Sequence, residues 1–224
     1  MKNVCSLLCA LFLFSSLTNA QECANGWFSF EEGTERIYTT YNKKGKEKGT
    51  AAHTVANVDG GEITLTVTSS DGKDEYTSDL KVYCNGDNVE FDMKDFINQM
   101  TASMSQSEME FNIESTRRAY PASLEAGDEL PSATASYSAG ISGLTMVKGE
   151  IEVKDRKVIG KESVTVPAGT FDAVKISYTL VSSVGFGRTE MQVTEWIAKG
   201  QGMVRTETMR KGKLESYTEL TTLK

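Results

Sequence analysis

The chain offers few side chains whose type and spacing could carry out chemistry. Its only histidine, His53, lies between Ala52 and Thr54 in a strand-like run, with no serine or cysteine motif beside it. A histidine acts as a general base only when the group it deprotonates lies within hydrogen-bond reach. We therefore expect His53 to be a packed or surface side chain and not a catalytic base.

Paired carboxylates are the other chemistry to consider, because two of them can hydrolyse a glycoside when they flank the bond. The acidic pairs Glu31–Glu32, Asp74–Glu75 and Asp128–Glu129 are adjacent in sequence, and adjacent residues on a strand point to opposite faces. The chain also lacks the G-x-S-x-G, H-E-x-x-H and D-x-D-x-D-G motifs. We expect no catalytic residue, no metal ligand and no cofactor, and hence not an enzyme.

The N-terminus has the layout of a secretory signal peptide. Lys2 precedes an apolar run over residues 4–17, and Thr18 and Ala20 are small residues that suit a cleavage site. The run is too short for a membrane-spanning helix, so we expect no transmembrane segment in the mature chain. Residues 1–20 are predicted to be removed, which leaves residues 21–224 in an exported protein, either periplasmic or secreted.

Two cysteines, Cys23 and Cys84, remain after the predicted cleavage. Exported compartments are oxidising, so this even pair predicts one disulfide bridge between the N-terminal arm and a strand. The residues before Cys23, Gln21 and Glu22, do not fit a lipid-attachment site. The net charge of −7 for the full chain disfavours nucleic acid and anionic membranes as partners.

The elements that would position any functional group are mostly strands. Pro167 and Gly169 predict a tight turn, after which Val174, Ile176, Tyr178 and Leu180 alternate with other residues, as in a half-buried strand. Similar alternation, bounded by turns, recurs through residues 34–92 and 144–223. Asp155 and Arg156 are expected to form one of these turns.

One segment changes period. The apolar residues Met93, Phe96, Ile97, Met100 and Met104 recur at helical spacing after Asp92, a good N-cap. Residues 115–143, rich in Ser, Ala, Gly and Pro, are expected to be a connector between two halves, about 21–114 and 144–224, or a mobile loop over a cavity mouth. The fold class predicted is mainly β: one domain in which a curled antiparallel meander forms an open or partly closed barrel with one amphipathic helix packed on it, the alternative being two sandwiches.

A family resemblance rests on the run V-T-V-P-A-G-T-F-D-A-V-K-I followed by W-I-A-K-G-Q-G-M-V-R, within residues 161–205. In the order and spacing of these pieces the chain resembles the TapB-like family of exported bacterial proteins, a domain-of-unknown-function group. The resemblance implies an exported β-rich protein connected with secretion or envelope assembly. It supplies no catalytic residues.

Two functions remain open at this point. The first is a non-catalytic binding module that holds an apolar small molecule or lipid in the curl of the sheet. The residues expected to contact such a ligand are Phe96, Met100, Met104, Ile176, Tyr178 and Trp196. The second is an interaction subunit of an envelope or secretion assembly, with an envelope protein as its partner. An enclosed apolar cavity would favour the first function, and an exposed apolar patch over a filled core would favour the second.

Overall fold

The computed structural model describes residues 26–101 and 110–224, and it places every strand of these residues in one sheet. The predicted signal peptide, Cys23 and Met104 lie outside the described residues. The elements are β1 (Glu35–Asn42), β2 (Glu47–Asp59), β3 (Glu62–Ser70), β4 (Glu75–Asn85), β5 (Asn88–Asp92), α1 (Met93–Thr101), β6 (Glu110–Ser115), β7 (Arg117–Pro121), β8 (Glu129–Leu130), β9 (Ala133–Ile141), β10 (Leu144–Val166), β11 (Gly169–Val184), β12 (Gly187–Ala198), β13 (Gly202–Arg210) and β14 (Lys213–Leu223).

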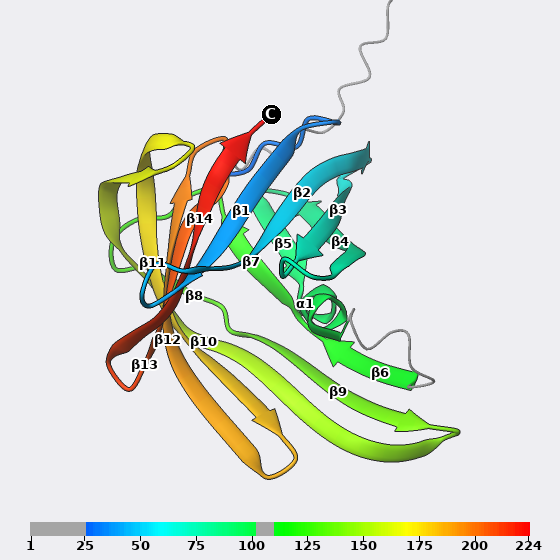
Figure 1. Cartoon of the computed structure of the whole chain (residues 1–224). Coiled ribbons are helices and arrows are strands. Elements are labelled where there is room, and N and C mark those ends of the chain that lie inside the picture. The colour runs from blue at the N-terminus through cyan, green and yellow to red at the C-terminus, as the bar shows by residue number, and fades with distance from the viewer. Residues whose placement is uncertain (1–25, 102–109) are drawn as a thin grey trace, which may run out of the picture.

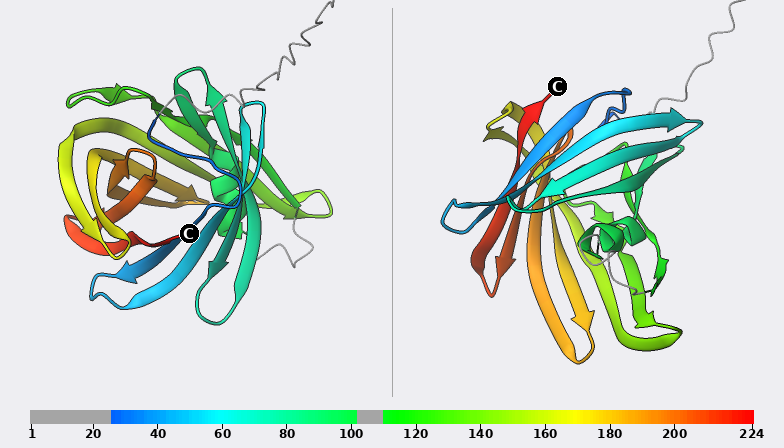
Figure 2. Two further views of the ribbon diagram at one scale, coloured as in Figure 1. Left: turned by 90° about the horizontal axis from the view of Figure 1, so that it is seen from above. Right: turned by 45° about the vertical axis from the view of Figure 1, so that its right-hand side comes forward.

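The sheet is built from two meanders that join through their outer strands. Strands β1 to β5 pair in sequence order, as do β9 to β14, and β14 pairs with β1. All pairings are antiparallel, so short turns suffice between neighbours. The sheet curls strongly (Figures 1 and 2), and apolar side chains of its strands form a buried core. The predicted mainly β fold, a curled antiparallel meander with one packed helix, is confirmed.

The two edges of the sheet meet at a single residue, Thr116. It separates β6, which pairs with β9 at one edge, from β7, which pairs with β5 at the other. The Thr116 amide donates to the carbonyl of Thr134 at 2.8 Å, and its own carbonyl accepts from the amide of Met93 at 3.2 Å. The barrel is therefore nearly closed, because one extended segment changes partner at this point.

Residues 115–143 are not the connector that their composition suggested. They contribute β7, β8 and β9, and β7 carries buried Tyr120 at the barrel edge. Small residues serve packing here: Ala133 and Ala135 are both buried in one cluster with residues of α1. Composition misled the prediction because Ala and Ser suit a strand that a helix approaches closely.

The turn predicted at Asp155–Arg156 is also wrong. Strand β10 runs without interruption through both residues, and its register with β11 shifts between Lys154 and Lys157. Asp155 adopts a positive φ of 53°, which a short polar side chain tolerates. The result is a bulge that bends a long strand, where the sequence pattern had indicated a reversal.

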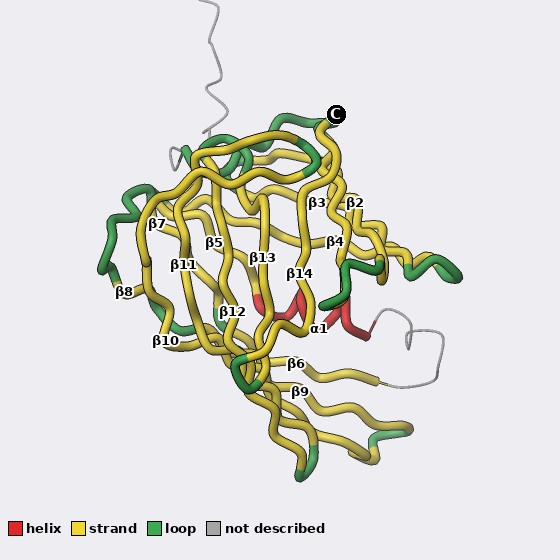
Figure 3. The backbone as a smooth tube through the Cα atoms, turned by 60° about the vertical axis from the view of Figure 1, so that its left-hand side comes forward, coloured by secondary structure: helices red, strands yellow, loops and turns green. Residues whose placement is uncertain are grey.

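Helix α1 covers one end of the curled sheet, beside β4, β6 and β9 (Figure 3). Asp92 caps it as predicted, since its Oδ1 accepts from the Lys94 amide at 2.9 Å. Asp95, in the first turn of the helix, is buried and accepts from the Lys81 amide of β4 at 2.8 Å. The helix is thus tied to the sheet by a carboxylate as well as by apolar packing. Among the described residues no helix is long and apolar enough to cross a membrane.

Candidate functional site

A cavity of about 430 Å³ lies between the inner face of the curled sheet and α1. This volume falls within the range of about 300–1,000 Å³ that small-molecule sites occupy. Most of its wall is apolar, and the apolar residues include Phe28, Phe30, Leu65, Leu80, Phe91 and Leu180. Strands of both meanders line this cavity, and α1 contributes Phe96 to its wall.

Two of the residues predicted to contact a ligand, Phe96 and Tyr178, line this cavity. Phe96 of α1 keeps 41% of its surface exposed, so its ring is available at the cavity wall. Ile176 is fully buried in the adjoining core cluster. Met100 lies in α1, and Met104 lies outside the described residues.

The sixth predicted residue, Trp196, lies away from the cavity. Its neighbours Glu195 and Ile197 line the cavity, and consecutive side chains of a strand point to opposite faces. Trp196 packs instead with Val166 and Ala173, near the turn between β10 and β11, and its indole N–H donates to Glu162 at 2.6 Å. It is a structural anchor of that hairpin.

A buried ion pair, which the sequence prediction missed, crosses the interior. Arg118 of β7 contacts Glu195 of β12 at 2.5 Å, and the Tyr120 hydroxyl donates to the same carboxylate at 3.2 Å. The Arg118 guanidinium also lies 4.5 Å from the centroid of the Tyr178 ring. A signal was available: Val193, Glu195 and Ile197 share one face of a strand, so an apolar face carried one acid that needed a partner.

A second buried arginine, Arg156, lies beside this pair. It follows the bulge of β10 and is 2% exposed, and its Nη1 donates to the carbonyl of Pro131 at 3.0 Å. Its guanidinium lies 4.9 Å from the Tyr120 ring, and burial lowers its pKa. Arginine tolerates such surroundings because its planar cation stacks on aromatic faces.

A third buried arginine, Arg36, belongs to a separate group at the cavity wall. It pairs in register with His53 across β1 and β2, and the His53 ring lies 4.9 Å from the Tyr38 ring in an edge-to-face arrangement. Burial, with a smaller effect of Arg36, lowers the pKa of His53 to about 4. Burial raises the pKa of Tyr38 to about 12. Both side chains are therefore uncharged at neutral pH.

The near neighbours of His53 are an aromatic ring and a cation, not a nucleophile. In the part of the chain that the structure describes, no cluster of three or more His, Cys, Asp or Glu side chains could hold a metal ion. What the cavity does provide is a largely apolar wall with a few convergent polar groups, which is the usual form of a small-molecule binding site.

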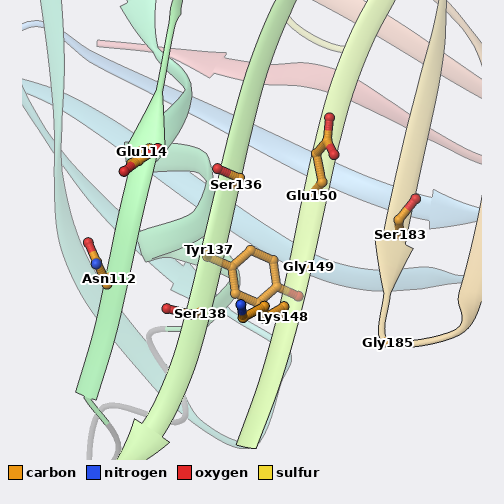
Figure 4. Close-up of a pocket in the computed structure, with 10 residues that line it drawn as sticks. All are labelled: Asn112, Glu114, Ser136, Tyr137, Ser138, Lys148, Gly149, Glu150, Ser183 and Gly185. Carbon is orange, nitrogen blue, oxygen red and sulfur yellow. The ribbon is translucent and has the colours of Figure 1, made fainter. Parts of the chain in front are cut away.

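A second hollow, of about 410 Å³, lies on the strands that project from the barrel (Figure 4). Most of the residues that line it have polar side chains, and they include Asn112, Glu114, Ser138, Lys148 and Glu150. The Tyr137 ring lies over Gly149, where an added Cβ would approach the ring to 2.4 Å. The ring thus covers the glycine of a neighbouring strand, and the hollow is a shallow surface feature.

The projecting hairpins end in exposed apolar side chains. Phe186, in the turn between β11 and β12, is fully exposed, and Leu144 and Met146 of β10 are largely so. The Gly185 amide donates to the Lys148 carbonyl at 3.0 Å, which holds the two hairpins together. We call Leu144, Met146 and Phe186 the hairpin tips.

Comparison with known proteins identifies relatives of the same architecture. The model of the DUF3108-like family matches residues 31–220. A candidate lipoprotein from Parabacteroides distasonis ATCC 8503 is 26% identical, with a TM-score of 0.72 over 88% of this chain and 98% of that one. A candidate exported protein with a YmcC-like fold, from Bacteroides fragilis NCTC 9343, is 22% identical, with a TM-score of 0.70 over the same shares.

No curated protein matches the chain. The matches support a family of β-rich proteins without an assigned activity, and the TapB-like name suggested by the sequence motifs is not confirmed.

Proposed function

The chain belongs to the DUF3108-like family, and we propose that it is an exported, non-catalytic protein that binds an apolar small molecule or lipid inside its curled sheet. The observation that carries this proposal is the cavity of about 430 Å³ with its largely apolar wall. A concave site of this size, with a mostly apolar wall and a few polar groups, has the form of most small-molecule binding sites.

Two further observations support the proposal. The similar structures from Parabacteroides and Bacteroides are described as a candidate lipoprotein and a candidate exported protein, which agrees with the secretory pattern of residues 1–20. Phe96 lines the cavity and is 41% exposed, so its ring is accessible to a ligand there. We place the mature protein in the envelope or outside it, either periplasmic or secreted.

The test is ligand recovery together with a blocking variant. The mature protein, purified without detergent, is extracted with organic solvent, and the extract is analysed by mass spectrometry. An apolar fluorescent dye is then titrated into the delipidated protein. Thr208→Trp places a large ring at the cavity wall and should weaken dye binding at least tenfold. Thr145→Trp, the same change at an exposed position of β10, is the control and should bind normally. Equal binding by both variants would contradict the proposal.

The hairpin tips favour a second candidate function, an interaction subunit of an envelope assembly. Exposed apolar groups that cluster on a projecting element mark interaction sites more often than scattered ones do. The double variant Leu144→Ser with Phe186→Ser should lose crosslinks from the tips to an envelope protein, whereas Ile159→Ser, an exposed apolar change elsewhere on β10, should keep them. Unchanged crosslinking in the double variant would reject this role.

A further inference from the structure

Arg36 is a buried cation without a carboxylate partner among the described residues. It is 9% exposed and lines the cavity. One of its terminal nitrogens donates to the carbonyl of Ser29 at 2.9 Å and lies 3.5 Å from the carbonyl of Gly200. Its Nε is buried and has no acceptor among the described residues.

The other ions at the cavity wall are already neutralised. Arg118 is paired with Glu195. Asp92 accepts from the Lys94 amide and from the Ser115 hydroxyl, and its second oxygen lies 3.6 Å from the ammonium of Lys94. No charge within this wall is therefore left to balance Arg36.

The groups nearest to Arg36 do not balance it either. His53, opposite it in register, and Tyr38, two residues along β1, are both neutral at pH 7 because burial shifts their pKa values away from neutrality. An unpaired charge in an apolar environment is destabilising, and the hydrogen bonds that Arg36 donates to two carbonyls offset only part of that cost. A protein that retains such a group gains when an anion occupies the site.

We propose that Arg36 binds the anionic end of a single-chain amphiphile whose tail fills the apolar cavity, the end group being a carboxylate or a phosphate. This inference rests on the proposed function and specifies its ligand. Arginine suits the role because its planar guanidinium presents several donors to such an oxyanion. The volume of about 430 Å³ suits one acyl chain better than two.

The positions of the elements give the ligand a direction. Arg36 lies near Gly200, just beyond the end of β12, whereas α1 packs in the same cluster as Val193, further back along that strand. A strand rises about 3.3 Å per residue. The Arg36 guanidinium and α1 are therefore separated by roughly the length of the strand segment that runs from Val193 to Gly200. The tail would extend from Arg36 towards Phe96.

The experiment compares three ligands of equal chain length on the delipidated mature protein by calorimetry: hexadecanoate, hexadecyl phosphate and hexadecan-1-ol. We expect both anions to bind ten- to a hundredfold more tightly than the alcohol, which is the scale of one charge-assisted hydrogen-bonded contact. Arg36→Gln should lower the affinity for both anions to the affinity for the alcohol, and it should leave the affinity for the alcohol unchanged. Arg188→Gln, an exposed charge-matched control, should keep the preference, and Arg36→Lys should keep part of it.

The outcomes separate the two proposals. Equal binding of hexadecanoate and hexadecan-1-ol to the wild-type protein would overturn the role of Arg36 and leave apolar binding intact. This comparison needs no variant, so it stands even if Arg36→Gln does not fold. If inorganic phosphate bound as tightly as hexadecyl phosphate, the tail would add nothing to the affinity, and the proposal of an amphiphilic ligand would be overturned. Failure of all three chains to bind would reject cavity binding itself. A purely structural Arg36 would show as a lower melting temperature in Arg36→Gln with unchanged ligand preference.

Discussion

Arg118 and Glu195 form an ion pair of 2.5 Å that joins β7, at the edge of the sheet, to β12 on the other side of the interior. Their side chains are 17% and 3% exposed, so the pair is shielded from water. Because β7 is half of the segment that closes the barrel, this contact ties the closing strand to the second meander. The edge of the sheet is thus held by charge as well as by its backbone ladder.

Removal of one partner should be costly. Glu195→Gln leaves Arg118 buried and unpaired, so we expect a loss of about 3–5 kcal/mol in the free energy of unfolding, measured by urea denaturation. The double variant Arg118→Met with Glu195→Gln should recover part of that loss. Glu125→Gln breaks the exposed pair with Lys161 and should cost less than about 1 kcal/mol. Equal losses of free energy of unfolding in Glu195→Gln and Glu125→Gln would show that the pair of Arg118 and Glu195 is not shielded from water.

Adjacent residues of α1 should respond very differently to truncation. Ile97 is 1% exposed and packed in the core, whereas Phe96 is 41% exposed at the cavity. Ile97→Ala should therefore cost about 2–5 kcal/mol, and Phe96→Ala well below the 3–5 kcal/mol of a buried phenylalanine. Phe96→Ala should instead weaken apolar dye binding. A loss at Phe96 as large as that at Ile97 would mean that its ring is part of the core.

The single histidine should make stability depend on pH. The pKa of His53 is about 4 in the folded protein and about 6.5 when unfolded, so the unfolded state binds the extra proton between these values. The stabilising contribution is complete above pH 6.5 and is lost as the pH falls towards 4, by about 3 kcal/mol. The wild-type protein should lose more stability over this window than His53→Gln does, measured on delipidated protein. Parallel curves for the two proteins would show that His53 is solvated.

The predicted bridge between Cys23 and Cys84 has its own test. Cys23 lies outside the described residues, and Cys84 is the second-last residue of β4. Thiol counting on denatured, unreduced mature protein should find no free thiol. Reduction should lower the free energy of unfolding by about 3–4 kcal/mol for a loop of this length. Two free thiols per chain would reject the bridge.

The sequence alone determined the local elements well. Alternation predicted the strand through Val174 and Leu180, Asp92 predicted the start of the helix, and the spacing of Met93 and Ile97 predicted the face of α1 that packs on the sheet. These features depend on the periods of the backbone and on hydrogen bonds between near neighbours, which a short stretch of sequence specifies. Export and a single β-rich domain remain sequence-based predictions.

Only the tertiary structure decided how the barrel closes and which charges it buries. Thr116 reads as an ordinary residue in a polar stretch, yet the change of strand partner there depends on β5 and β9, which are distant in sequence. Arg36, Arg118 and Glu195 lie far apart in the chain, and their burial follows from which faces of the curled sheet point inward. Such contacts depend on the register and curl of the whole sheet. The position of Glu195 between Val193 and Ile197 indicates an acid on an apolar face, but nothing near it in the chain identifies Arg118 as its partner.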